Sequence, residues 1–141
     1  MKWVTREKAR VDRIACPWLI SRFIDRDATF LFVPPDQVLK VAQRDGAIPY
    51  DVPGGELGHH GERCSFDAFL DKYGLDDPGL RSLALVVRGA DTEARHLTPE
   101  SPGLYAAASG FREVTADDFD NMAKQFPMYD AMYAFCRARS R

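Results

Sequence analysis

The reactive side chains of this sequence are concentrated in the segment from Glu56 to Asp67. Two of the three histidines, His59 and His60, lie in this segment together with Cys64. Imidazole, thiol and carboxylate groups bind metal ions, act as nucleophiles and transfer protons. Glycines at positions 54, 55, 58 and 61 allow the backbone of such a loop to approach a ligand closely. We therefore expect the functional site of the chain in this loop.

The first interpretation of the loop is a transition-metal site. Zinc, iron and manganese are held by roughly three or four nitrogen, sulfur or oxygen donors at about 2 to 2.3 Å. The candidate donors are Glu56, His59, His60, Asp67 and Asp91, with His96 as an alternative to Asp91. Because the side chains of adjacent residues diverge, one of His59 and His60 would bind the ion and the other would orient a ligand or act catalytically. The identity of the metal and the choice of histidine stay open.

A second interpretation makes Cys64 a catalytic nucleophile. Cys64 directly precedes Ser65, which is a predicted helix cap, and the positive end of a helix dipole would lower the pKa of the thiol. His60 would act as the base, oriented by Glu56 or Asp67, as in other nucleophile–base pairs. The alternative is that Cys64 packs as a small apolar side chain. This alternative also stays open.

Two arginines, Arg13 and Arg88, are candidates to bind an anion and to assist catalysis. Arg13 follows Asp12 just ahead of a predicted helix, and Arg88 precedes Asp91 at the end of an apolar run. Guanidinium groups bind oxyanions through paired, charge-assisted hydrogen bonds. For each arginine the alternative is a structural ion pair with a neighbouring carboxylate.

The apolar pattern predicts a single compact α/β domain, residues 1–141, that is predominantly helical. We expect about six helices and a small sheet of two or three strands, with strands at residues 3–5, 29–33 and 48–52. The first helix should have Pro17 in its first turn. The other helices are expected at 36–45, 66–73, 77–91, 103–109 and 115–136.

Four residues are expected to set the ends or the shape of these helices. Ser65 should cap the helix at 66–73, and Gly110 should end the helix at 103–109. Thr115, paired with Asp118, resembles a capping box for the last helix. Pro127 should kink or split that helix, because proline lacks the backbone N–H group.

The composition excludes several classes of protein. The net charge of -2 argues against direct nucleic-acid binding. No apolar run approaches the roughly 20 residues that span a bilayer, and the N-terminus has no apolar signal segment, so we expect no membrane interaction. The three cysteines form no C-x-x-C pair, which indicates a reducing, cytoplasmic location. A homodimer built on the aromatic residues near the C-terminus remains an open alternative.

Five motifs, in order along the chain, resemble the chromate-resistance protein family. They are VDRIACPWLI at 11–20, FLFVP at 30–34, ELGHHG at 56–61, CSFD at 64–67 and VRGADT at 87–92. This family corresponds to the C-terminal domain of the ChrB-type regulator of chromate efflux operons. The resemblance implies a bacterial cytoplasmic protein linked to chromate resistance, and it supplies no set of catalytic or ligand residues. Since the chain lacks the N-terminal half of the longer regulator, we expect no role as a transcription factor.

The predicted function is therefore a chromate-resistance-associated protein with a metal site in the loop at 56–67. Its small-molecule ligand would be chromate or a related oxyanion, held by Arg13 and Arg88 and either sensed or converted by redox or hydrolytic chemistry. Two alternatives stay open: a non-enzymatic regulatory or sensor module, and a metal-free, cysteine-dependent enzyme of sulfur or redox chemistry. Whether the protein is an enzyme is not decided by the sequence.

Overall fold

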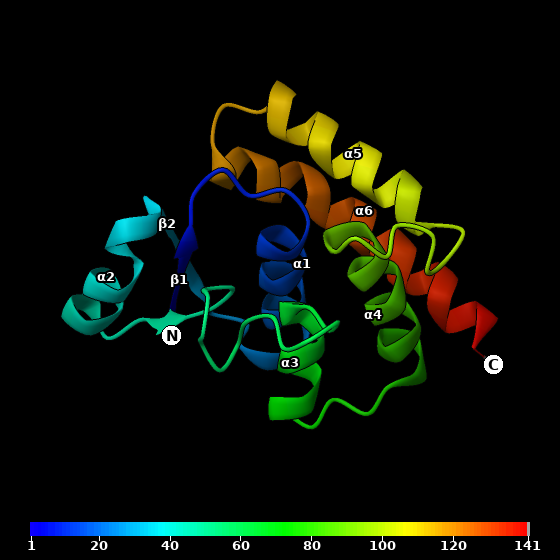
Figure 1. Ribbon diagram of the computed structural model, residues 1–141, viewed down its shortest axis with the longest axis horizontal. Coiled ribbons are helices and arrows are strands. Elements are labelled where there is room, and N and C mark those ends of the chain that lie inside the picture. Colours follow the sequence, from blue (N-terminus) through cyan, green and yellow to red (C-terminus); the bar gives the residue numbers. More distant parts are fainter. Residues whose placement is uncertain (141) are drawn as a thin grey trace.

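A small parallel sheet begins the fold of the computed structural model, which describes residues 1–140 (Figure 1). Strand β1 (Lys2–Arg6) lies between β2 (Thr29–Val33) and β3 (Ile48–Pro49), and it pairs Trp3 with both Phe30 and Ile48. Helical segments connect β1 to β2 and β2 to β3, as parallel pairing requires. The predicted small sheet is confirmed. Strand β3 is shorter than the expected 48–52 and lies at an edge, where proline is tolerated.

Within residues 1–140, six α-helices make up most of the structure outside the sheet, which confirms the predominantly helical α/β class. They are α1 (Asp12–Leu19), α2 (Val38–Asp45), α3 (Ser65–Lys72), α4 (Pro78–Asp91), α5 (Ser101–Val114) and α6 (Asp118–Arg139). A π-helical segment, η1 (Ile20–Ile24), continues α1, and a 3₁₀ turn, η2 (Pro35–Gln37), leads into α2. Arg141, the last residue of the predicted domain, lies outside the described residues.

The sheet separates two apolar clusters of unequal size. Successive side chains of a strand point to opposite faces, so β1 places Trp3 in the main core and Val4 in a small cluster. The small cluster is completed by Val38 and Val41 of α2 together with Ala47. Helix α2 thus covers one face of the sheet, and the remaining helices lie on its other side (Figure 1).

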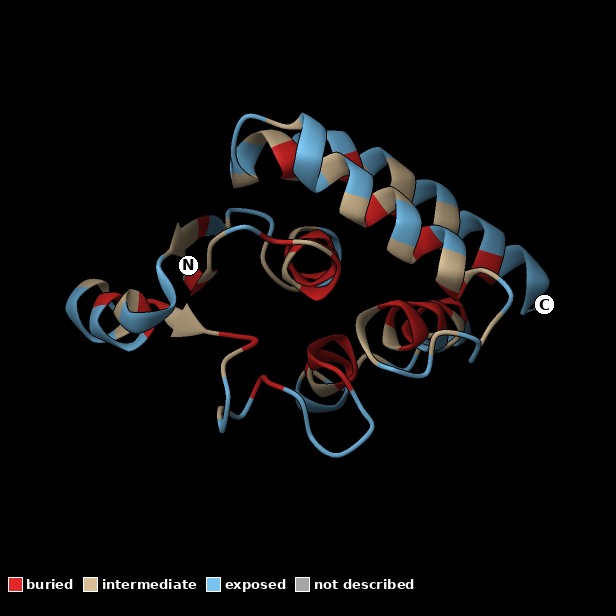
Figure 2. Ribbon diagram, turned by 45° about the horizontal axis from the view of Figure 1, so that its top comes forward, coloured by how far each residue is buried: buried red, intermediate tan, exposed pale blue. Residues whose placement is uncertain are grey.

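The main core is built between helices α1, α3, α4 and α6. Helix α6 packs against α1, α4 and α5, while α1 also contacts α3. Figure 2 shows buried positions where α1, α3 and α4 face the centre of the molecule. Close approach of α4 to α5 requires Gly89, because a Cβ atom there would lie 2.2 Å from the Ser101 Oγ atom. This packing brings the N-terminal ends of α1 and α3 close to the C-terminal end of α4, where the reactive groups gather.

Two expected helix starts are wrong, and both lie beside the candidate site. Helix α1 begins at Asp12, so Pro17 lies in its second turn instead of its first. Ser65 is the first residue of α3, and Cys64 is the N-cap residue. The Asp67 carboxylate accepts a hydrogen bond from the Cys64 backbone N–H at 3.0 Å, as an acidic residue of a capping box does.

Two further expectations about the C-terminal helices are also wrong, and the expected split of the last helix is absent. Helix α5 begins at Ser101 and continues through Gly110 to Val114. The N-cap residue of α6 is Asp117, whose carboxylate accepts from the Asp120 backbone N–H at 2.8 Å, whereas the Thr115 hydroxyl donates to a carbonyl of α5. Helix α6 is also not split at Pro127, because it is one helix from Asp118 to Arg139. Its packing against three other helices outweighs the single backbone hydrogen bond that proline removes.

Candidate functional site

The centre of the site is the carboxylate of Asp12, which is buried at the N-terminal end of α3. Its Oδ2 atom accepts from the Ser65 backbone N–H at 2.7 Å, and its Oδ1 atom accepts from the Phe66 N–H at 3.2 Å. These are N–H groups of the first turn of α3, which have no partner within the helix. The positive end of the helix dipole also favours a carboxylate at this position. Asp12 therefore caps a helix that begins more than fifty residues later.

Asp91, the last residue of α4, is held beside Asp12. Its Oδ1 atom accepts from the Asp12 backbone N–H at 3.2 Å, which satisfies the first N–H group of α1. The other oxygen, Oδ2, lies 2.9 Å from the Nε2 atom of His59. One carboxylate thus joins the end of α4, the start of α1 and the loop that carries the histidines.

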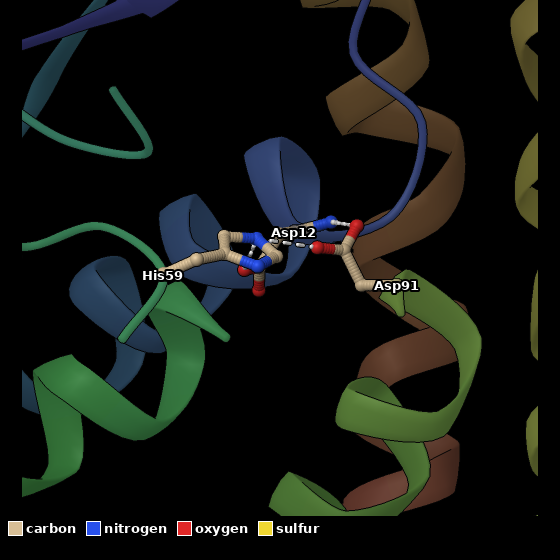
Figure 3. Close-up of side chains that lie close together, drawn as sticks. All are labelled: Asp12, His59 and Asp91. Atoms are coloured by element: carbon tan, nitrogen blue, oxygen red, sulfur yellow. Dashed lines mark hydrogen bonds and ion pairs between the residues drawn. The ribbon is translucent and has the colours of Figure 1, made fainter. Parts of the chain in front are cut away.

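His59 directs one ring nitrogen at three carboxylates. Besides Asp91, its Nε2 atom lies 3.3 Å from Asp51 Oδ1 and 3.6 Å from Asp12 Oδ2. Figure 3 shows Asp12, His59 and Asp91 pointing toward one another from α1, the loop before α3 and the end of α4. The loop is anchored locally by buried Leu57 and by Gly58, where a Cβ atom would lie 2.6 Å from a backbone oxygen. We call Asp12, Asp51, His59 and Asp91 the acid–histidine cluster.

Asp51 connects this cluster to two arginines. Its Oδ1 atom accepts a hydrogen bond from the Ser65 hydroxyl at 2.7 Å. Its Oδ2 atom lies 3.3 Å from the Nη2 atom of Arg6 and 3.5 Å from the Nε atom of Arg13. The backbone of Asp51 is left-handed, with a φ of 52°, a conformation uncommon for residues other than glycine. Such strained positions are concentrated at functional sites.

The charges of the cluster shift the pKa values of its members in opposite directions. Hydrogen bonds to Asp51 and Asp91 are the main reason that the pKa of His59 rises to about 10, so the ring is an imidazolium near neutral pH. Burial, followed by the charges of Asp91 and Asp51, raises the pKa of Asp12 well above its ordinary value. Burial also opposes ionisation of Asp51, but hydrogen bonds from His59 and Ser65 and the two nearby arginines lower its pKa overall.

Three cluster members have the geometry of a metal-ligand set. One ligand atom each from Asp12, His59 and Asp91 lies within 4.8 Å of the other two. Carboxylate oxygen and imidazole nitrogen together suit zinc, iron or manganese. The side chain of Asp12 is 1% exposed and that of His59 is 41% exposed, so an ion held there would be buried on one side and open on the other. The cluster thus combines a buried negative charge with an accessible face.

Of the five donors expected from the sequence, the structure brings only His59 and Asp91 together. Glu56 is exposed, and its carboxylate pairs with Lys72 at 3.0 Å. His60 is also exposed, with its Nε2 atom 2.9 Å from the Glu56 carbonyl oxygen. Asp67 is buried, but it forms a two-point ion pair with Arg88 at 2.8 and 3.0 Å. None of these three side chains belongs to the ligand set found within residues 1–140.

Both arginines that were expected to bind an anion already contact groups of the protein. Arg88 directs two of its nitrogens at Asp67. The Nη1 atom of Arg13 donates to the carbonyl oxygens of Arg6 and Glu7, each at 3.0 Å. Arg88 is thus in an ion pair with Asp67, and Arg13 contacts two carbonyl oxygens and lies near Asp51.

The expected lowering of the pKa of the Cys64 thiol is wrong. Burial and the negative charges of Asp12 and Asp67 raise the pKa of the Cys64 thiol instead of lowering it. The Sγ atom lies 3.4 Å from Asp67 Oδ2, and within residues 1–140 no histidine nitrogen hydrogen bonds to it. The dipole of α3 is directed instead at the Asp12 carboxylate, so Cys64 is a buried thiol at a helix start.

A cavity of about 470 Å³ opens beside the cluster. His59 forms part of its wall, as do Arg88, which is one helical turn before Asp91, and Thr92, which follows Asp91. The remaining wall comes from residues 61–62 and from the segment after α4. A ligand in this cavity would therefore contact the exposed side of His59.

Asp12 and Asp51 are the site residues that sequence reasoning did not recognise as donors. In the sequence, Asp12 stands out only as the neighbour of Arg13 ahead of the first helix, and Asp51 only as a residue of the predicted strand 48–52. One signal was present: Asp51 lies near the carboxyl end of a predicted strand, and ligands of parallel sheets bind outside the carboxyl ends of their strands. Nothing local in the sequence indicated that Asp12 would meet the helix start at Ser65.

The fold and the site define a small, helical α/β domain with an acid–histidine cluster beside a cavity. The chain belongs to the family described as "ChrB, C-terminal domain", whose model matches residues 3–136, and the predicted family resemblance is confirmed. It is 35% identical over 142 positions to Protein ChrB of Cupriavidus metallidurans, covering 99% of this chain and 42% of that protein. No solved structure matches the chain. Within residues 1–140, no helix is both long enough and apolar enough to cross a bilayer.

The raised pKa of His59 predicts how stability of the metal-free protein depends on pH. The pKa of His59 is about 10 in the folded state and 6.5 in the unfolded state, so protonated His59 stabilises the folded protein. This stabilisation is complete below pH 6.5 and is lost as the pH rises toward 10. His59→Gln should therefore cost stability at pH 6 and much less at pH 10, as measured by urea unfolding. His60→Gln, which keeps His59, should retain the pH dependence of the native protein. A cost of His59→Gln that is the same at both pH values would contradict the assignment.

The environment of Cys64 predicts a slow thiol. In the native protein, Cys64 should react with a disulfide reagent far more slowly than after unfolding, because the thiol is buried and its pKa is raised. Peptide mapping by mass spectrometry would identify the modified cysteine. Cys64→Ser should change the free energy of unfolding by no more than about 1 kcal/mol, since serine is a good N-cap residue. Rapid native-state labelling of Cys64 would restore the nucleophile hypothesis.

Proposed function

We propose that this chain is a metal-binding domain in which Asp12, His59 and Asp91 hold one divalent transition-metal ion. The observation that carries the proposal is the convergence of carboxylate oxygens on the Nε2 atom of His59. Asp51 lies beside this set and would orient the histidine and balance charge. This modifies the expected donor set by replacing Glu56, His60 and Asp67 with Asp12.

The electrostatics of the cluster support a bound cation. Three carboxylates near one point repel one another, and this repulsion contributes to the raised pKa of Asp12. The proton on His59 supplies the compensating positive charge in the metal-free protein. A divalent ion would replace that proton and supply a larger charge at the same position. Metal uptake near neutral pH should therefore be accompanied by proton release from the cluster.

The hydrogen bonds around the cluster would orient its ligands before metal binds. Asp12 is fixed by two N–H groups of α3, and Asp91 is fixed by the N–H group of Asp12. Outer contacts of this kind orient metal ligands and strengthen binding. Asp12 and Asp91 lie at helix ends, and His59 follows Gly58, where the loop packs tightly against its own backbone. Ligands that are already positioned in this way lower the entropic cost of assembling the site.

The adjacent histidines provide a matched test of the metal site. Purified metal-free protein should take up one equivalent of zinc, iron(II) or manganese(II), measured by equilibrium dialysis and elemental analysis. His59→Gln should weaken uptake by roughly a hundredfold or more, because outer contacts alone contribute tenfold to a hundredfold and His59 is a ligand. His60→Gln and Glu56→Gln should bind as the native protein does.

Two results would contradict the metal proposal. One is substoichiometric uptake of all three metals by the native protein after reconstitution. The other is equal loss of uptake in the His59→Gln and His60→Gln variants, which would place the metal elsewhere in the loop. Asp91→Asn offers an independent check, because it removes a second proposed ligand from a different segment of the chain.

A second candidate function, binding of chromate or a related oxyanion, is supported by the charge of the metal-loaded network. A divalent ion together with Arg6 and Arg13 would carry one positive charge more than the ionised carboxylates neutralise. These carboxylates are those of Asp12, Asp51 and Asp91. An anionic ligand on the metal would neutralise this excess. The family relationship makes chromate the oxyanion to test, either as a sensed ligand or as a substrate.

The oxyanion function predicts selective binding that depends on metal. Metal-loaded protein should bind chromate more tightly than sulfate in equilibrium dialysis, and His59→Gln should abolish the difference because it empties the site. Both anions are tetrahedral dianions, so charge alone does not separate them. Equal, weak binding of the two anions would count against a chromate-specific sensor or enzyme.

A further inference from the structure

Two arginines, Arg10 and Arg95, contact the ring of Tyr105 from different segments of the chain. The Cζ atom of Arg95 lies 3.6 Å from the ring centroid, and the Cζ atom of Arg10 lies 5.1 Å from it. Arg10 belongs to the connection between β1 and α1, Arg95 to the connection between α4 and α5, and Tyr105 to α5. The ring thus holds two positive charges near one point, and its attraction for each cation offsets only part of their mutual repulsion.

Neither of these guanidinium groups forms an ion pair with a carboxylate within residues 1–140, whereas eight other arginines do. Arg95 uses one nitrogen, Nη1, to donate to the Ala90 carbonyl oxygen. A guanidinium carries five N–H donors in its own plane, so stacking on a ring leaves the other donors available to an acceptor. Arg10 and Arg95 are both half-buried, so each has a face that solvent and solutes reach. The pair therefore combines uncompensated charge with unused donors.

Hydrogen bonds hold both segments that carry these arginines. Next to Arg10, the Ala9 N–H donates to the Asp118 carboxylate at 2.7 Å, and the Ala9 carbonyl oxygen accepts from the Asn121 amide at 3.0 Å. Ahead of Arg95, the Thr92 hydroxyl donates to a carbonyl oxygen of α4 at 2.7 Å. Because the backbone on both sides is already ordered, little order has to be gained when a ligand binds.

We propose that Arg10 and Arg95 together bind a tetrahedral dianion, such as sulfate, phosphate or chromate, beside Tyr105. Two guanidinium groups match two negative charges, and the oxygens of a tetrahedral anion accept from both groups at once. With hydrogen bonds of about 2.8 Å on each side, such an anion joins Cζ atoms that are roughly 8 Å apart. Since both Cζ atoms contact the same ring, their separation cannot exceed the sum of their distances to its centroid, which is close to that span.

This anion site shares no residue with the acid–histidine cluster, and the inference does not need the proposed metal. Arg10 lies two residues before Asp12, and Arg95 donates to the carbonyl oxygen of the residue that precedes Asp91. The site is therefore next to the cluster along both segments of the chain. It differs from the second candidate function, in which the oxyanion binds to the metal itself.

The test uses metal-free protein, so that no anion binds through a metal. Sodium sulfate, phosphate and chromate are each titrated against sodium chloride at equal ionic strength, and the arginine Nε–H signals are followed by NMR spectroscopy. The signals of Arg10 and Arg95 should shift together and saturate, because both groups contact the same ion. Arg10→Gln and Arg95→Gln should each weaken binding about fivefold, as the loss of one partly exposed ion pair does, and the double variant should show no saturable binding.

Two control variants separate this site from general charge effects and from the cluster. Arg26→Gln removes an exposed arginine that also forms no ion pair within residues 1–140, and His59→Gln changes the cluster; both should bind the anions as the native protein does. Three results would overturn the inference: no saturable joint shift in the native protein with any of the anions, equal weakening by Arg26→Gln and Arg10→Gln, or loss of binding in His59→Gln. The first result needs no variant, so a variant that fails to fold does not prevent the test. Metal uptake is measured separately, so failure of either proposal leaves the other standing.

Discussion

The structure depends on one buried interaction, the capping of α3 by the carboxylate of Asp12. A carboxylate that is 1% exposed is costly to bury unless hydrogen bonds and opposite charge compensate it. Here the N–H groups of Ser65 and Phe66 supply the hydrogen bonds, and His59 supplies the charge. The same contact joins the first residue of α1 to the first turn of α3. Removing the carboxylate would therefore disturb the fold and the site together.

The cluster around Asp12 is a balanced network. In the metal-free protein, the carboxylates of Asp12, Asp51 and Asp91 lie near the imidazolium of His59. Asp51 also lies near the guanidinium groups of Arg6 and Arg13. When all six groups are ionised, their formal charges cancel. Asp51 is central to this balance because one of its oxygens faces the histidine and the other faces the arginines. Asp51 therefore connects the charge of His59 to the charges of the two arginines.

Local patterns predicted the elements whose apolar periodicity is uninterrupted. The strand Thr29–Val33, the helix from Pro78 to Asp91 and the end of the second helix at Asp45 agree with expectation. Errors arose where packing overrides a local signal. Gly110 and Pro127 both lie inside helices, since α5 and α6 gain more from contact with each other and with α4 than a glycine or a proline costs.

The sequence by itself determined the fold class and the family, because periodicity, composition and ordered motifs are local properties of the chain. It also included His59 and Asp91 among the candidate metal ligands. Only the tertiary structure decided which carboxylates surround the histidine, since Asp12, Asp51 and Asp91 lie far apart in sequence and meet through the packing of α1, α3 and α4. That packing also decided that the dipole of α3 holds Asp12 instead of activating Cys64.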